Sequence, residues 1–140
     1  MPAGAIVLVD TGPLVAVFDP SDRDHEACTA ELGTLSQSRL VTTLAVLTEA
    51  SYLLAFSAEA QRSVIEFAGA GAIELPELDA SDLARAAGLM KKYADLPMDL
   101  ADATLVVLAE RLRTSRIFTL DRQDFSVYRV GRKTFRILPA

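Results

Sequence analysis

Short apolar segments that alternate with helical patterns constrain the fold of this chain more than any other feature. Four segments are rich in β-branched residues and almost continuously apolar: residues 5–9, 39–43, 72–75 and 116–120. Strands of this kind are typical of parallel sheets, in which helices cover both faces. A fifth segment, residues 135–138, has the same character, and we expect it at an edge of the sheet.

Segments with helical character lie between these apolar runs, at residues 12–18, 21–35, 44–56, 57–71, 80–94 and 97–112. Strands that alternate with helices predict an α/β domain built on a parallel sheet. The sequence contains no internal repeat and no linker long enough to divide it. We therefore expect a single domain over residues 1–140.

Composition excludes several classes of protein and of chemistry. Hydrophobic residues make up 51% of the chain, yet no apolar run approaches the roughly 18 residues that a membrane span needs. The first residues carry no basic region, so we expect no signal peptide and a cytoplasmic protein. Cys28 is the only cysteine, so no disulfide can form within the chain. His25 is the only histidine, which argues against a Ser-His-Asp triad and a His-rich zinc site.

The net charge of −5 argues against a nucleic-acid partner, but the charges are unevenly distributed. Eight of the 14 Lys and Arg residues lie between Arg111 and Arg136, together with only two of the 19 acidic residues. A basic C-terminal part on an acidic body could bind phosphates. A solvated basic surface is the alternative, and charge alone slightly favours it.

Two aspartates follow predicted strands. Asp10 ends the first apolar run, and Asp121 ends the run at residues 116–120. Ligands of open α/β sheets bind beyond the carboxyl ends of the strands, so both residues lie where chemistry is expected. For either residue alone, a turn or a helix cap is the simpler explanation, because Asp suits both.

Glu49 stands inside a strongly apolar helical segment. Its helical neighbours three and four residues away are Ala45, Val46, Tyr52 and Leu53, and none is a cation. Burying an unpaired carboxylate costs much free energy. Glu49 must therefore reach water at the edge of the apolar face, meet a cation elsewhere, or bind a metal.

Asp99 and Asp102 lie near the start of the last predicted helix. Pro97 suits a helix start, and the helix dipole favours an acid there, which explains Asp99 well. It explains Asp102 less well, because Leu105 and Val106 continue the face on which Asp102 stands. A carboxylate aligned with core residues at the open end of a helix is expected to point into a cleft.

The acids at positions 10, 49, 102 and 121 would repel one another if they converged. Divalent cations that prefer oxygen ligands, Mg²⁺ or Mn²⁺, would supply the counter-charge. Such a site can activate a water and stabilise the transition state of phosphodiester cleavage. Spacing alone does not show that the four residues converge.

Four segments, in order, resemble the PIN-domain family, and most of all the VapC-type ribonuclease toxins of bacterial toxin–antitoxin pairs. They are IVLVDTGPLVAVFDPSDRDHEA, VTTLAVLTEASYLL, DLPMDLADATLVVLAERL and RIFTLDRQDF. Their ordered set is specific, although no single segment is. The resemblance covers nearly the whole chain and implies a Rossmann-like three-layer α/β/α domain with a central parallel sheet. It also implies an endoribonuclease that depends on Mg²⁺ or Mn²⁺.

The resemblance implies a role for each acidic residue. The family's first aspartate matches Asp10, its helical glutamate matches Glu49, and its aspartate before A-x-L matches Asp102. Its T-x-D-x-x-F segment matches TLDRQDF and places Asp121 in the site. The aspartates at 10, 102 and 121 are the implied metal ligands, and Glu49 is a further ligand or orients the attacking water. The implied accessory residues are Thr11, Asp99, Thr119 and Asp124.

The resemblance also implies partners, namely an RNA substrate, a second copy in a homodimer, and an antitoxin whose C-terminal segment covers the site. Two other readings remain open: a PIN-like domain that is not a toxin, and a catalytically inactive one that only binds a partner. Metal binding without turnover would favour the inactive domain.

A haloacid-dehalogenase-like phosphatase or a response-regulator receiver also places an aspartate after the first strand. The phosphatase needs a second acid two residues later, where this chain has Gly12. The receiver needs an acidic pair and a lysine after a late strand, and Arg122 stands there instead. Both readings are disfavoured on these grounds.

Overall fold

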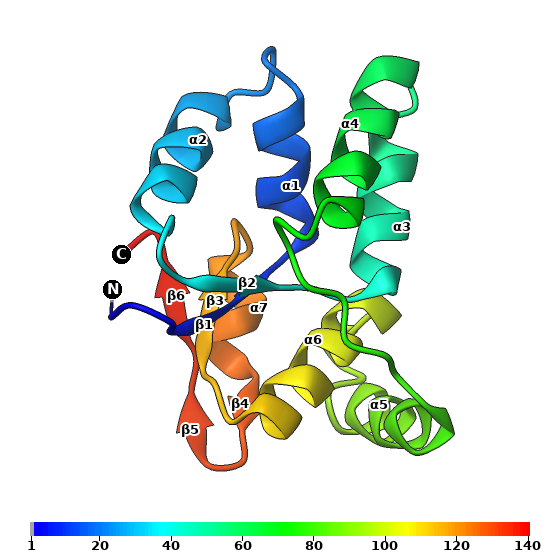
Figure 1. Ribbon diagram of the computed structural model, residues 1–140. Coiled ribbons are helices and arrows are strands. Elements are labelled where there is room, and N and C mark those ends of the chain that lie inside the picture. The colour runs from blue at the N-terminus through cyan, green and yellow to red at the C-terminus, as the bar shows by residue number, and fades with distance from the viewer. Residues whose placement is uncertain (1) are drawn as a thin grey trace.

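A four-stranded parallel sheet forms the centre of the computed structural model, which describes residues 2–140 (Figure 1). The strand order is β2-β1-β3-β6, and each neighbouring pair is parallel. In the register, Leu8 lies opposite Ile117, so the carboxyl ends of β1 and β3 are neighbours in the middle of the sheet. The strands are β1 (Ile6–Val9), β2 (Arg39–Val41), β3 (Arg116–Phe118) and β6 (Arg136–Leu138).

Helices cover both faces of this sheet, as the continuous apolar character of the strands predicts. Val7 and Leu8 of β1 are completely buried. In Figure 1, α1, α2 and α4 lie on one side of the sheet, and α5 and α6 lie on the other. The three-layer α/β/α architecture is therefore confirmed. The helices are α1 (Thr11–Phe18), α2 (His25–Thr34), α3 (Leu44–Leu53), α4 (Ala58–Gly69), α5 (Ala80–Lys92), α6 (Leu100–Leu112) and α7 (Arg122–Val127).

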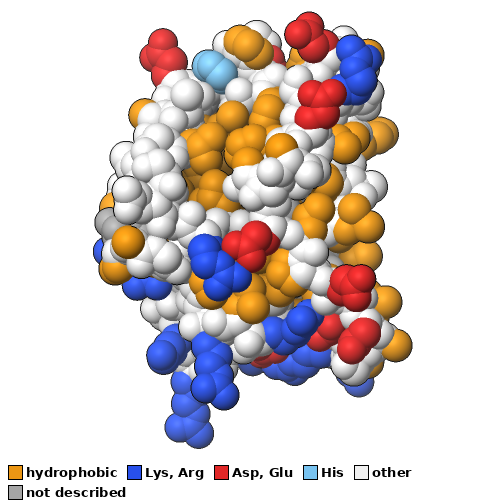
Figure 2. All heavy atoms as spheres, viewed as in Figure 1, with side chains coloured by type: hydrophobic (Ala, Val, Ile, Leu, Met, Phe, Trp, Pro, Cys, Tyr) orange, Lys and Arg blue, Asp and Glu red, His pale blue; other side chains and the backbone are white. Residues whose placement is uncertain are grey.

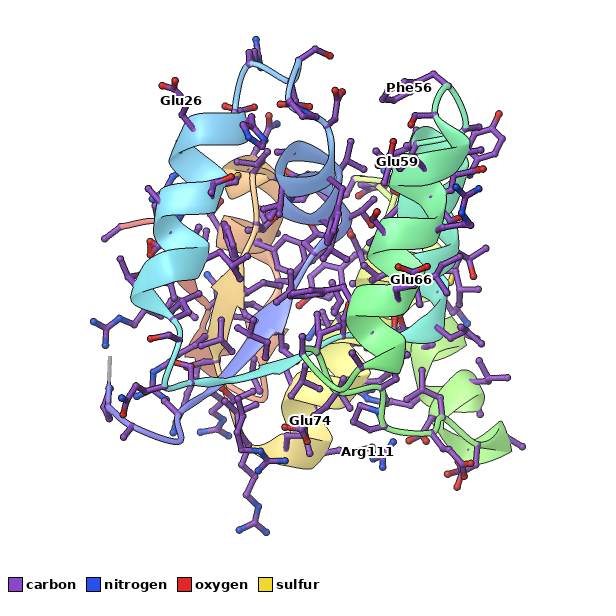
Figure 3. The ribbon with its side chains drawn as sticks, turned by 45° about the horizontal axis from the view of Figure 1, so that its top comes forward. Glu26, Phe56, Glu59, Glu66, Glu74 and Arg111 are labelled. Atoms are coloured by element: carbon purple, nitrogen blue, oxygen red, sulfur yellow. The ribbon has the colours of Figure 1, made fainter. Side chains whose placement is uncertain are left out.

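The predicted strand at residues 72–75 is reduced to one bridge. Glu74 lies opposite Val41 of β2 in this bridge. Its N–H donates to the Leu40 carbonyl at 2.8 Å, and its carbonyl accepts from the Thr42 N–H at 2.9 Å. Figure 3 labels Glu74 on the segment that leaves α4. Pro76 follows two residues later and has no N–H to donate, so the ladder does not continue. The predicted edge strand at residues 135–138 is confirmed as β6, with β3 as its only neighbour in the sheet.

α6 begins later than the sequence predicts. Its first residue is Leu100 rather than Pro97, because Asp99 caps the helix with its side chain. From Ala103 to Ala109 every residue of α6 is buried, since the helix runs through the core and contacts α3, α5 and β1. This course places the open end of α6 beside the carboxyl ends of the strands.

The C-terminal part contains three elements that the sequence analysis did not predict. They are α7 and a two-stranded antiparallel hairpin formed by β4 (Arg129–Val130) and β5 (Lys133–Thr134). Gly131 in the hairpin turn has a φ of 63°, a conformation that suits glycine. No helix within residues 2–140 is long and apolar enough to cross a membrane.

Candidate metal centre

A pocket of about 490 Å³ opens at the carboxyl ends of β1 and β3. Six carboxylates line it, and no Lys or Arg of the described chain does. We call it the acidic pocket. The structure thus brings together the four acids that the sequence analysis proposed as the core of a site. Its lining residues are Asp10, Thr11, Gly12, Glu49, Leu53, Pro97, Asp99, Asp102, Leu120, Asp121 and Asp124.

Three of these carboxylates are also helix caps. Asp10 is the N-cap of α1, Asp99 of α6 and Asp121 of α7. Each accepts a hydrogen bond of 2.8–3.0 Å from a backbone N–H in the first turn of its helix. Capping and pocket lining are therefore not alternatives in this fold, because three helices start at the same edge of the sheet.

Asp10 is the most deeply placed of the six acids, with 7% of its surface exposed. Its Oδ1 accepts from the Thr11 N–H at 2.8 Å, and its Oδ2 accepts from the Thr119 hydroxyl at 2.7 Å. Burial raises the pKa of Asp10 to about 6, against the lowering effect of these two hydrogen bonds. The charges of Glu49 and Asp121 raise that pKa further.

Thr119 connects two of the acids. While its hydroxyl donates to Asp10, its Oγ1 accepts from the backbone N–H of Asp121 at 3.0 Å. The side chain of Thr119 is 1% exposed, so its position is fixed by the core. Thr119 therefore holds the carboxylate after β1 in register with the chain after β3.

Asp102 carries the largest perturbation in the pocket. Burial raises its pKa to about 8, and the charges of Asp10 and Asp99 add to the effect. The Tyr128 hydroxyl donates to Asp102 Oδ2 at 2.8 Å and opposes the rise. Burial and the adjacent Asp102 raise the pKa of Tyr128 in turn, so its phenol stays a donor.

Tyr128 was not predicted from the sequence as a residue of the site. The residue is fully buried beneath the pocket, where its ring packs edge-on against Tyr93 and Phe125 with centroids 5.1 and 5.0 Å away. It follows the exposed Val127 at the end of α7. Nothing in this local sequence marks an inward-facing hydroxyl, so no signal would have identified it.

Glu49 enters the pocket from α3 and is half-buried. Burial raises its pKa first, and the charge of Asp99 raises it further. The Thr11 hydroxyl lowers that pKa, although it forms no hydrogen bond of standard geometry. Glu49 lines the acidic pocket and meets no cation in the described chain, so of its three expected environments the ion pair is excluded.

Three carboxylates come close enough to share one ion. Oxygens of Asp102, Asp121 and Asp124 lie within 4.8 Å of one another. The resemblance implies an accessory role for Asp124, and its carboxylate belongs to this trio. Asp10 lies outside it, and both its oxygens are engaged by hydrogen bonds. The pKa of Asp124 is raised by burial and by the charge of Asp121.

The pocket fits a hard divalent cation. Three of its carboxylates place oxygens within 4.8 Å of one another, and Mg²⁺ binds oxygen ligands at about 2.1 Å. All charged donors are carboxylates, which favours Mg²⁺ or Mn²⁺ over softer metals. The buried Thr11 Oγ1 finds no hydrogen-bond partner in residues 2–140, which leaves a polar atom free for a ligand or its water.

A larger groove of about 1140 Å³ adjoins the acidic pocket and shares Glu49 and Asp99 with it. We call it the apolar groove. Several large side chains that line it are strongly exposed, which is unusual for a folded surface without a partner. They are Leu44 (68% exposed), Tyr52 (77%), Leu83 (51%) and Leu100 (48%).

A three-layer α/β/α fold, with acidic side chains that converge beyond the ends of its parallel strands, agrees with the family resemblance. The chain belongs to the PIN-domain family, which it matches over residues 7–131. It is 38% identical over 136 residues to Ribonuclease VapC26 of Mycobacterium tuberculosis. That match covers 95% of this chain and 100% of the relative.

Solved structures share the fold at low sequence identity. VapC20 of Mycobacterium tuberculosis, a toxin that cleaves the sarcin-ricin loop, superposes with a TM-score of 0.72 at 16% identity over 79% of this chain and 86% of its own. VapBC2 of Rickettsia felis, bound to a fragment of its promoter DNA, superposes with a TM-score of 0.68 at 14% identity. The match covers 94% of this chain and 98% of the VapBC2 chain. A chain of a toxin–antitoxin complex of Klebsiella pneumoniae superposes with a TM-score of 0.62 at 21% identity, over 86% of this chain and 91% of its own.

Proposed function

We propose that this chain is an endoribonuclease that uses Mg²⁺ or Mn²⁺ and acts as the toxin of a VapBC-type pair. The observation that carries the proposal is the convergence of six carboxylates with no facing cation in a chain 38% identical to a ribonuclease. Its expected products are a 5′-phosphate and a 3′-hydroxyl.

Asp102 and Asp121 would hold the ion, and they are common to the family-based ligand set and to the trio seen in the structure. Asp124 would complete the trio. Asp10 is the candidate for a further ligand, because Thr119 holds its carboxylate at the pocket. When bound, the ion would activate a water and stabilise negative charge on the phosphate.

Glu49 would orient the attacking water. It comes from a different element than the trio, faces the same pocket, and has a raised pKa that suits proton exchange with a water. Asp99 would act through charge, since it raises the pKa values of both Glu49 and Asp102. Thr11 and Thr119 would position the carboxylate of Asp10.

An antitoxin segment is the proposed occupant of the apolar groove. Two of the similar structures contain toxin and antitoxin together, which supports a partner of this kind. The groove has exposed Leu and Tyr side chains and an acidic rim that includes Glu77 and Asp79. A fitting segment would be apolar with basic residues, able to reach the acidic pocket. The homodimer and the cytoplasmic location are further predictions.

Cleavage of a mixed RNA pool tests the proposed function. The purified chain should cleave it with Mg²⁺ or Mn²⁺ and stop when EDTA removes the ion. A chain that binds Mn²⁺ but leaves the pool intact would support the inactive, partner-binding domain instead. A small neighbouring gene for a DNA-binding protein would separate the toxin from a PIN domain that is not one.

A further inference from the structure

Cations without partners gather at the end of the molecule opposite the acidic pocket. Arg113 ends α6 and Lys133 lies in β5, and both line a second pocket of about 430 Å³. Thr114 and Ser115 line the same pocket from the segment before β3. Arg132 stands in the adjoining hairpin turn. In Figure 2, Lys and Arg side chains gather at the lower end, where Figure 1 places this hairpin.

The cations at this end of the molecule form no ion pairs with the described residues. The side chains of Arg113, Arg132, Lys133 and Arg136 are exposed and make no ion pair or hydrogen bond with residues 2–140. We call these four residues the basic edge. Glu110 is the only acid that lines the pocket, and Arg85 already holds both of its oxygens at 3.0 and 2.8 Å.

Two exposed arginines elsewhere in the described chain, in contrast, form ion pairs. Arg39 binds Glu74 at 2.7 Å, and Arg111 binds Asp82 at 3.1 Å. Figure 3 labels Glu26, Glu59 and Glu66 on α2 and α4, far along the chain from the hairpin. The basic edge is therefore left uncompensated locally, on a chain whose net charge is −5. A local field of this sign attracts phosphates despite the net charge.

The basic edge and the acidic pocket are separated by a distance that one RNA can span. Asp102 and Arg113 lie at opposite ends of α6, and a rise of about 1.5 Å per residue puts them roughly 16 Å apart along its axis. This separation is about half the length of one turn of B-form DNA, which is about 34 Å. α7 runs between the two regions, with Arg122 exposed at its start and Arg129 just after its end.

We propose that the basic edge binds the sugar–phosphate backbone of a structured RNA substrate at a distance from the cleavage site. The proposal rests on the proposed function and assigns it a second contact surface. Arg and Lys side chains and Ser hydroxyls contact phosphates in nucleic-acid complexes. The Thr114 hydroxyl is not available, because it already donates to the Ile6 carbonyl at 2.8 Å. The edge has no exposed aromatic ring to stack on a base, so it binds backbone and not sequence.

Anisotropy titrations of a labelled random-sequence RNA hairpin pool, in EDTA so that no cleavage occurs, test this surface. The double variant Arg113→Gln/Lys133→Gln should bind about tenfold more weakly than the parent chain. Its slope of log affinity against log salt should become shallower by about 1 per removed cation. The swap Arg113→Lys/Lys133→Arg should restore binding, which separates lost charge from lost folding.

Arg23→Gln/Arg62→Gln is the matched control, because it removes the same net charge from exposed positions near α2 and on α4. The proposal that the basic edge binds RNA would be overturned by any of three results: an equal loss of RNA affinity in both double variants, an unchanged salt slope, or no RNA binding by the parent chain. Absence of metal-dependent cleavage by the parent chain would count against the proposed function instead, and the salt slope would still decide the edge.

Discussion

At the residue scale, two carboxyl groups of the acidic pocket hold protons at pH values where ordinary aspartates have lost them. The pKa is about 6 for Asp10 and about 8 for Asp102, and burial is the main cause of both. The folded chain therefore favours the protonated form of each group more than the unfolded chain does. This contribution to stability is fully present below pH ~4, the unfolded value, and is lost as the pH rises through the folded value.

Asp102→Asn should accordingly stabilise the metal-free protein, and more so at pH 8 than at pH 5. The amide removes the charge, while its oxygen can still accept from Tyr128. The gain at pH 8 should be on the order of 1 kcal/mol or more, read from thermal melts in EDTA. Asp95→Asn, at an exposed site outside the pocket, serves as the control. A large loss of stability would show that Asp102 serves mainly as a structural acceptor.

Tyr128→Phe should weaken Mn²⁺ binding by about tenfold, because groups that orient a metal ligand contribute on that scale. The change removes the hydroxyl that fixes Asp102 Oδ2 and leaves the buried ring in place. Calorimetric titration with Mn²⁺ measures the effect without RNA. Tyr93→Phe is matched, since its hydroxyl accepts only from the Arg129 backbone N–H. Equal Mn²⁺ affinity in all three proteins would remove the positioning role of Tyr128.

The sequence could predict most of the pocket residues but not their geometry. Strand ends and an apolar helix face pointed to Asp10, Asp102 and Asp121, and the structure places all of them at one edge. The close approach of Asp124 depends on α7, which is six residues long and too short to show a helical period. The role of Tyr128 depends on tertiary packing, which no local pattern encodes.

At the element scale, the pocket exists because α1, α6 and α7 all begin at the same edge of the sheet. Each helix start brings a capping aspartate, so the fold concentrates negative charge where the helix dipoles partly offset it. Strands and long helices were predictable from apolar periodicity. The single bridge at Glu74 and the β4–β5 hairpin were not predictable from this periodicity. Pro76 ends the first after one residue pair, and the hairpin strands are two residues long, too short to show alternating apolar and polar residues.

Asp99 allows capping and electrostatics to be separated. Asp99→Ser keeps a capping oxygen for α6, so the free energy of unfolding should stay within a few tenths of a kcal/mol. Asp99→Ala removes the cap and should cost about 1 kcal/mol. Both changes remove the charge that raises the pKa values of Glu49 and Asp102. Denaturant unfolding in EDTA measures the difference, and equal stability of the two variants would mean that the cap contributes nothing.

At the scale of the whole molecule, the chain separates its charges. Six carboxylates face the acidic pocket at one end of α6, and the basic edge lies at the other. The excess of cations between residues 111 and 136 was visible in the sequence. The sequence did not show which of these cations lack ion-pair partners. That depends on tertiary pairs such as Arg85 with Glu110, which join α5 to α6. The apolar groove likewise needed the fold, since its walls come from α3, α5 and α6.

The carboxylates of the acidic pocket are expected to act together on RNA through a divalent ion. The most direct measurement is cleavage of a mixed RNA pool by the parent chain, Asp102→Asn, Asp121→Asn and the double variant, with Mg²⁺ or Mn²⁺ and with EDTA. We expect metal-dependent cleavage by the parent chain, loss of most activity in each single variant, and little further loss in the double variant, because residues that act as a unit are not additive. Cleavage that persists in EDTA or survives Asp102→Asn would contradict catalysis by a metal ion held in the acidic pocket.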